Sequence, residues 1–356
     1  MRMGNHAALS TVMLNLDDDD QAEAVDAFVL AHPQGTPFHR SAWMIAVERA
    51  TGNRSHMLAA VGPSGSIRGV LPCHHVQSRL FGQALVSSAF AVGGGILAND
   101  PAAVAALASA AQDLARANGD LPVELRGGPS PAAPWTTRVG EHVGFCRQLA
   151  ADDEAELLAV PRKHRAELRK ALANPALRVE HGRSARNLRD HYRVYGESVR
   201  HLGTPVFPRR LFQEVLLRFG EDADITLVYD RDKPVSAVLT LYHQGRVMPF
   251  WGGGVGDARR LRSNELMYYR LMAHGRSRGM TQFDFGRSKA GSGQAAWKKS
   301  FGFTAEPLAY HDWSPSGATR DISPHSARYQ WRIALWKRLP LPLANLFGPL
   351  ISRGLG

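Results

Sequence analysis

The feature that most constrains the fold of this 356-residue chain is an order of segments that occurs twice. In the first half, a hairpin pattern and a strand pattern lead to Gly93–Gly95, and a helix pattern and a short strand pattern then end at Gly127. The second half repeats this order, with Gly252–Gly254 and Gly286 at the matching places. Each glycine triplet begins 34 residues before its terminal glycine. The repeat indicates an internal duplication.

The repeated segments also predict the fold class. Alternating apolar residues predict hairpins over 56–72 and 225–242, and helix patterns follow at 101–118 and at about 263–279. Because hairpins precede helices in both copies, each sheet should be mostly antiparallel. We predict an α+β or mixed α/β fold of two tandem domains, each a mixed, mostly antiparallel sheet flanked by helices.

The length of the chain supports two domains, because a single core rarely grows to this size. We place an N-terminal domain at 1–150, a C-terminal domain at 151–325 and a basic, apolar tail at 326–356. Only the second copy follows its late strand with a cationic segment, since the first copy has L-R-G-G-P-S at that place. We therefore expect the active site in the C-terminal domain.

Composition excludes several classes of protein. The net charge is +11, so an anionic partner is expected, whether nucleic acid, a phosphorylated co-substrate or an acidic membrane face. Cys73 and Cys146 are too few and too far apart for a disulfide scaffold or a cysteine-built zinc site. The histidines have no metal-ligand spacing, so we predict no metal. The N-terminus lacks a signal-peptide pattern and no apolar run reaches membrane-span length, so we expect a cytoplasmic protein, with contact to the inner membrane at most peripheral.

A basic helix is predicted over 161–172, with Pro161 at its first position. Arg165 and Arg169 lie on one face of this helix. Two interpretations remain open: a solvated basic face, or an anion-binding surface that faces a cleft between the domains.

The segment around Gly252–Gly254 also has two interpretations. Glycines between a strand and a helix let main-chain N–H groups approach a phosphate, helped by the helix dipole. Here the residues that would contact a donor are Gly253, Gly254, Arg262 and Asn264, with Ser263 as the predicted helix cap. The nucleotide-binding glycine motifs are missing, so a flexible basic loop explains the segment equally well.

The most specific local signal is T-Q-F-D-F-G-R-S-K-A-G-S-G-Q-A-A-W-K-K-S-F-G-F, residues 281–303. Asp284 lies in an alternating strand that we expect to end at Gly286, after which Arg287, Ser288 and Lys289 leave the sheet. Gly291 and Gly293 predict an irregular loop that leads to Lys298 and Lys299. A strand carboxylate followed by cations suits acyl transfer, because the carboxylate can deprotonate an amine while a cation stabilises the oxyanion. Alternatively, Asp284 anchors a turn or a salt bridge.

This segment resembles the C-terminal signature of FemAB-related proteins, which join two GNAT-type acyltransferase folds in tandem. Five further segments resemble the same family, namely residues 38–43, 80–95, 161–171, 198–208 and 338–350. The likeness is strongest to the FemAB-like proteins associated with exosortase (PEP-CTERM) and exopolysaccharide systems. It runs from about Phe38 to the C-terminus. The helical arm of the FemAB enzymes and the acetyl-CoA pyrophosphate signature of ordinary GNAT enzymes are not recognisable here.

The resemblance implies two GNAT-like domains and transfer of an acyl or aminoacyl group to an amine of an envelope saccharide or lipid-linked precursor. The donor could be acyl-CoA, acyl carrier protein or aminoacyl-tRNA, with no tightly bound cofactor. Lys298 and Lys299 match the lysines of a family F-K-K segment, with Trp297 in place of the usual Phe, and one of them is expected near the donor carbonyl or phosphate. The resemblance also places Arg287, Ser288 and Lys289 facing the cleft. Tyr268 either lies under the substrate or is a core aromatic residue.

Two other classes of function remain open. The chain could be a non-catalytic binding protein of the exopolysaccharide machinery that keeps the cleft of the fold. It could also bind tRNA through its basic face, although no aromatic-interleaved motif supports this. The tail from Arg328 combines tryptophans, leucines and cations, which is typical of an interfacial membrane anchor; a segment packed across both domains would look similar.

Overall fold

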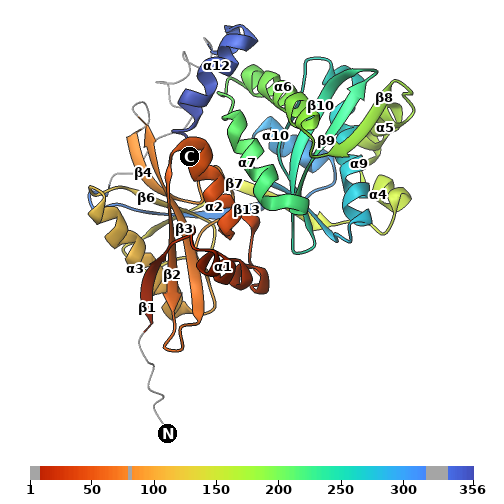
Figure 1. The fold of residues 1–356 in the computed structure, drawn as a ribbon. Coiled ribbons are helices and arrows are strands. Elements are labelled where there is room, and N and C mark those ends of the chain that lie inside the picture. The colour runs from red at the N-terminus through yellow and green to blue at the C-terminus, as the bar shows by residue number, and fades with distance from the viewer. Residues whose placement is uncertain (1–8, 79–81, 318–335) are drawn as a thin grey trace. The chain divides into compact units, whose positions relative to one another are not determined.

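The computed structural model describes residues 9–78, 82–317 and 336–356, and these fold into two compact units (Figure 1). Of the described residues, the first unit contains 9–78, 82–139, 309–317 and 353–356, and the second contains 140–308 and 336–352. The predicted boundary between the first two domains lies at residue 150, whereas the compact units divide between residues 139 and 140. The chain also returns to the first unit at Ala309, because Tyr310 to Trp313 pair with Arg126 to Val123 of that unit.

The first unit is built on a sheet in the order β1-β2-β3-β4-β6-β13. Neighbouring strands are antiparallel except for β4 and β6, which are parallel, and the short β5 pairs with β3. The strands are β1 (Ser10–Leu14), β2 (Arg54–Val61), β3 (Ile67–Ser78), β4 (Gly82–Ser87), β5 (Leu97–Ala98), β6 (Val123–Arg126) and β13 (Glu306–Trp313).

Helices cover both faces of the first sheet. The helical elements are α1 (Asp19–Ala31), the 3₁₀ turn η1 (Pro37–His39), α2 (Ser41–Thr51) and α3 (Pro101–Ala117). The core under α3 contains Leu58 and Ala60, whereas the core under α1 and α2 contains Met57 and Ala59. Successive strand residues point to opposite faces, so α3 lies on one face and α1 and α2 on the other.

The second unit is built on a sheet in the order β7-β12-β11-β10-β9-β8. All neighbours are antiparallel except β11 and β12, which are parallel. The strands are β7 (Thr136–Gln148), which belongs to this unit from Gly140 on, β8 (Leu177–Gly182), β9 (Ala223–Asp230), β10 (Lys233–His243), β11 (Arg246–Gly254) and β12 (Gln282–Lys289).

The helices of the second unit also form two groups. The core that contains Phe283 and Phe285 includes residues of α5, α9 and α10, whereas α6 and α7 pack with Trp251 of β11 through His191 and Phe212. The helices are α4 (Asp153–Ala159), α5 (Arg162–Leu172), α6 (Ala185–Leu202), α7 (Arg209–Phe219) with the 3₁₀ turn η2 (Gly220–Asp222), α8 (Ala258–Leu261), α9 (Ser263–Ser277), α10 (Gly293–Ser300) and α12 (Leu341–Ser352).

The duplication is visible in the two sheets. Each unit has three antiparallel strands, a helix and then a strand parallel to the third: β2-β3-β4-α3-β6 in one and β9-β10-β11-α9-β12 in the other. The predicted fold class is confirmed. The helix predictions over 101–118, 161–172 and 263–279 are also confirmed within a few residues, with Asp100 accepting the N–H of Ala103 at 2.9 Å as the cap of α3.

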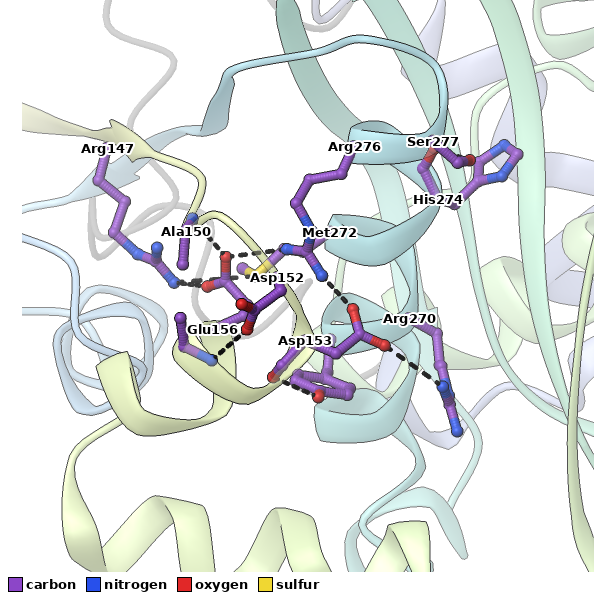
Figure 2. Close-up of polar contacts among 12 residues, drawn as sticks. Arg147, Ala150, Asp152, Asp153, Glu156, Arg270, Met272, His274, Arg276 and Ser277 are labelled. Carbon is purple, nitrogen blue, oxygen red and sulfur yellow. Dashed lines mark hydrogen bonds and ion pairs between the residues drawn. The ribbon is translucent and has the colours of Figure 1, made fainter.

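A buried ion network joins β7, α4 and α9 in the second unit. Glu156 of α4 is 0% exposed and accepts hydrogen bonds from the Arg147 guanidinium, from the Ala150 N–H at 2.9 Å and from Arg276 at 3.2 Å. Figure 2 shows the guanidinium groups of Arg147 and Arg276 directed at the Glu156 carboxylate from two elements. Arg276 also pairs with Asp153. A buried carboxylate needs partners of opposite charge. The network therefore fixes α4 between β7, which is the neighbour of β12, and α9.

Replacing Glu156 by Gln should lower the free energy of unfolding by about 3 kcal/mol, because two guanidinium groups would lose their buried counter-charge. Urea unfolding monitored by circular dichroism measures the change. Glu154→Gln on the exposed side of the same helix is the matched control and should shift stability by less than about 0.5 kcal/mol. Equal midpoints for the two variants would contradict a structural role for the network.

Candidate active site

The ladder between β11 and β12 contains only two residue pairs, Arg246 with Gln282 and Val247 with Phe283. Beyond them, β11 continues to Gly254 along β10, and β12 continues to Lys289 along β7. We call residues 248–254 and 284–289 the fork. All its residues are described, and main-chain groups that a complete ladder would join are not paired between its two arms. An extended ligand can bond to such strand edges.

The arm of the fork formed by β12 contains a bulge. The prediction that the strand ends at Gly286 is wrong, because β12 runs to Lys289. Its register against β7 shifts between Asp284 and Arg287, and Gly286 has φ +63°, a conformation that favours glycine. A bulge leaves residues unpaired and redirects the side chains around it. Beyond it, Arg287 to Lys289 pair again with Gly144 to His142.

Two side chains of opposite charge hold this bulge. The Asp284 carboxylate accepts the Gly286 N–H at 2.7 Å. The Lys298 ammonium, from α10, donates to the carbonyl oxygens of Phe285 at 2.8 Å and Arg287 at 3.1 Å, with that of Gly286 at 3.5 Å. The carboxylate therefore binds the N–H side of the bulge and the ammonium binds its C=O side.

The burial of these two groups changes their proton affinities. Burial raises the pKa of Asp284 above its usual value, an effect only partly offset by the Gly286 N–H and by Arg246 and Lys298. Burial lowers the pKa of Lys298 to about 8, and Asp284 opposes that shift. A carboxylate with a raised pKa is a stronger base than a solvated one, which suits proton abstraction.

The segment after β12 is a helix and not the irregular loop predicted from Gly291 and Gly293. Gly293 is the first residue of α10, and the Ser292 hydroxyl accepts the Ala295 N–H at 3.2 Å as its cap. Helical geometry separates neighbouring side chains by about 100°. Lys298 is consequently half-buried against the bulge, whereas Lys299 is exposed.

The tripeptide after the bulge does not form one surface. Ser288 is 3% exposed, and its hydroxyl has no hydrogen-bond partner among the described residues. Arg287 is half-buried and Lys289 is exposed. In an extended strand, Arg287 and Lys289 share one face and Ser288 points to the other. Arg287 and Lys289 can therefore act together on a ligand, while Ser288 lies inside.

Tyr268 of α9 lies in an aromatic cluster on the inner side of the bulge. Its ring centroid is 4.9 Å from that of Phe285 and 5.3 Å from that of Trp297. Burial raises the pKa of Tyr268 to about 12, so its phenol stays protonated at neutral pH. This environment favours the core interpretation of Tyr268 over a place under the substrate.

The glycines at the end of β11 serve close packing. A Cβ on Gly253 would lie 2.2 Å from the Ser198 hydroxyl oxygen of α6, and one on Gly254 would lie 2.4 Å from the Ala258 Cβ of α8. Both positions therefore exclude side chains for steric reasons that do not involve a ligand. The sequence analysis gave no role to Ser198 or to its neighbour Glu197, which accepts the Gly256 N–H at 3.1 Å. Only tertiary packing brings α6 to this strand end.

The start of α9 differs from the sequence prediction. Arg262, with φ +57°, is the residue before the helix, and no side chain caps it; Ser263 is the first helical residue and bonds to the Ser236 hydroxyl at 2.7 Å. Arg262 donates to Glu167 of α5 at 2.5 Å, and Asn264 accepts from Ser236 at 2.8 Å. Arg262 and Asn264 therefore fix α9 to its neighbours.

The basic helix α5 belongs to the second unit and packs against α9. Arg165 donates to the carbonyl oxygens of Val160 and Leu158, both at 3.1 Å, at the end of α4. Arg165 is thus engaged in capping α4, which cations do favourably. Arg169 is exposed on the same helix.

A surface cavity of about 330 Å³ lies elsewhere in the second unit, between α5, β8 and α9. Its lining is largely aliphatic, with His181 and Arg270 as the polar members, and none of its lining residues belongs to β11 or β12. The described residues contain no group of three side chains suited to a metal ion. Of the polar residues predicted from the sequence, Asp284, Arg287 and Lys289 lie on the β12 arm of the fork, and Lys298 bonds to the carbonyl oxygens of that arm. We therefore place the candidate site at the fork.

The first unit fills the place that corresponds to the fork. After β4, the Gly95 N–H donates to the Arg126 carbonyl at 3.0 Å, and a Cβ on Gly95 would lie 1.9 Å from the Gly127 oxygen. A Cβ on Gly128 would likewise lie 2.5 Å from the Ile96 oxygen. Main chain packs directly on main chain here, so this copy has no open arm for a ligand.

The Lys298 ammonium should lose its charge as the pH rises through about 8, because burial disfavours the charged form. After ¹³C-dimethylation of amines, we expect an NMR resonance that titrates near pH 8 and disappears in Lys298→Met. The terminal amine also titrates near this pH but persists in the variant. If the variant retains every resonance that titrates near pH 8, the burial of Lys298 is refuted.

Comparison with known proteins identifies the fold. Residues 159–299 match Acetyltransf_6, the acetyltransferase (GNAT) domain. No curated protein matches the sequence. The structure of FemX is similar, with a TM-score of 0.62 and 15% identity over 84% of this chain and 96% of FemX.

Two further solved structures are similar. A tandem GNAT protein from the clavulanic acid biosynthesis pathway has a TM-score of 0.55 and 12% identity, over 87% of this chain and 99% of that one. The C-terminal domain of a putative lysylphosphatidylglycerol synthetase from Agrobacterium fabrum has a TM-score of 0.54 and 13% identity, over 90% of this chain and 95% of that one. Together with the repeated sheets, these findings show that the chain has a tandem GNAT fold with an acetyltransferase (GNAT) domain in its second unit.

Proposed function

We propose that this protein is an acyl- or aminoacyltransferase that joins an activated acyl group to an amine at the fork of the second unit. The observation that carries the proposal is the half-buried Asp284 carboxylate at the bulged arm of an incomplete parallel pair. The match of residues 159–299 to an acetyltransferase domain supports the same class of reaction.

Asp284 is the proposed general base. The amine nitrogen attacks the carbonyl carbon of a thioester or ester, the new C–N bond forms, and the C–S or C–O bond breaks. Asp284 takes the proton from the attacking amine, which has no lone pair for attack while it is an ammonium. The leaving thiolate or alkoxide takes the second proton that the nitrogen loses as the amide forms, and Asp284 returns its proton to the solvent.

Lys298 acts through the main chain. Its N–H groups point at carbonyl oxygens of the bulge, so Lys298 is a positioning residue that fixes Asp284 and the neighbouring backbone. Lys299 is exposed and retains the role predicted from the family likeness, that of a cation near the donor carbonyl or phosphate. The exposed Arg259, ahead of α9, adds positive charge near the start of that helix for an anionic donor.

For the substrates we propose an acyl-CoA, acyl carrier protein or aminoacyl-tRNA donor and an amine of an envelope saccharide or lipid-linked precursor. The resemblance to exosortase-associated FemAB-like proteins supports this acceptor class. The likeness of fold to FemX and to a putative lysylphosphatidylglycerol synthetase domain is compatible with it.

The test is a donor screen. The purified full chain is incubated with each of the three donors and with amino-sugar and aminolipid acceptors, and mass spectrometry detects the acylated amine. We expect product with one donor class. Donor binding without product would favour the non-catalytic binding protein, and steeply salt-dependent binding of bulk tRNA alone would favour the RNA-binding alternative.

In the same assay, Asp284→Asn should lower kcat by about 100-fold or more, because the amide can still accept the Gly286 N–H but cannot take a proton. For the wild type, kcat/KM should rise with pH through the raised pKa of Asp284, since the base must be ionised. Lys299→Ala is a control for general charge loss and should change mainly KM. An Asp284→Asn variant with wild-type kcat would exclude Asp284 as the base.

A further inference from the structure

The C-terminal helix α12 has two unlike faces. The face that packs inside the second unit carries small residues, Ala344, Gly348 and Ser352, all buried. A Cβ on Gly348 would lie 2.9 Å from Val206, and the Ser352 hydroxyl donates to the Val206 carbonyl at 2.9 Å. Figure 1 shows α12 beside α6. The helix is therefore anchored along one side.

The opposite face of α12 is apolar and exposed. Leu343 is 42% exposed, Leu346 63%, Phe347 47% and Leu350 60%. These positions are spaced three and four residues apart, so they form one stripe along the helix. Four large apolar side chains side by side in water indicate an interaction surface, whereas scattered ones do not.

The charges around this stripe have one sign. Residues 336–356 contain no Asp or Glu, and Lys337 and Arg338 lie exposed just before α12 while Arg353 directly follows it. The Arg200 guanidinium lies at the N-terminal end of α12, where it donates a hydrogen bond to the Leu339 carbonyl at 2.9 Å. Within the described part of the tail, the apolar stripe is thus bounded by cations at both ends.

We propose that the exposed face of α12 binds the surface of an anionic lipid bilayer, with Leu343, Leu346, Phe347 and Leu350 inserted at the level of the headgroups. An apolar helix face flanked by Lys and Arg matches an anionic interface in both hydrophobicity and charge. A second copy of the chain fits less well. Parallel pairing of two α12 helices would bring Lys337 against Lys337, and antiparallel pairing would bring it against Arg353.

This surface has a direct connection to the candidate site. α12 packs on α6, and α6 supplies Ser198 and Glu197, which contact the glycine end of β11 at the fork. None of the described helices is long and apolar enough to cross a bilayer. If the proposed acyl transfer is correct, docking through α12 would hold the second unit at the surface where a lipid-linked amine lies.

Vesicle flotation tests the proposal without any measurement of activity, so its failure leaves the acyl-transfer proposal untouched. The full chain should float with vesicles of phosphatidylglycerol and phosphatidylcholine and only weakly with phosphatidylcholine alone. Leu346→Glu with Leu350→Glu should lower the partition coefficient by at least ~10-fold, because two inserted apolar side chains become charged. Lys337→Gln with Arg338→Gln should lower it about fivefold per charge on the anionic vesicles only.

Leu217→Glu is the matched control, because Leu217 is 71% exposed on α7 and does not belong to α12, so this change should leave flotation unchanged. Urea unfolding checks that the α12 variants keep their stability, as exposed positions predict. The proposal is overturned if the wild type does not float, or if the Leu346 and Leu350 variant floats as the wild type does. A wild-type dimer that this variant converts to monomer, without flotation, would assign the face to a second copy.

Discussion

The bulge in β12 is the constraint on which the candidate site depends. Asp284 binds its N–H side, Lys298 binds its C=O side, and Gly286 supplies the positive φ that the turn requires. Both charged groups are partly withdrawn from water, which raises the pKa of the carboxyl group and lowers that of the ammonium. A structural device that shapes the strand therefore also leaves a basic carboxylate at the point where β11 and β12 diverge.

The two halves of the chain show how one fold can be open in one copy and closed in the other. Both copies have a parallel strand pair that follows three antiparallel strands. In the first copy, Gly95 and Gly128 let the main chain pack directly into the place beside β6. In the second copy, the glycines at the end of β11 accommodate side chains of α6 and α8, and the ladder between β11 and β12 ends at Val247 and Phe283. Glycines thus let main chain close the place beside β6 in the first unit, whereas in the second unit they let helices pack at the end of β11.

The sequence was sufficient for the repeated hairpins and for α3, α5 and α9, because periodicity and capping are local signals. The sequence was insufficient where the structural role of a residue depends on partners that are distant in the chain. Gly286 and Gly293 look alike as strand or loop breakers, yet one forms a bulge and the other begins α10. The hydrogen bonds from Lys298 to carbonyl oxygens of β12 and the approach of α6 to β11 arise only from tertiary packing.

The central claim is that an activated donor binds along the open arm of the fork in the second unit and not in the first. Amide hydrogen exchange, followed by mass spectrometry with and without a donor, tests this most directly. We expect the donor to slow exchange in peptides covering residues 248–256 and 284–289 and to leave exchange in those covering 84–96 unchanged. Equal protection in both units, or protection confined to the first, would contradict it.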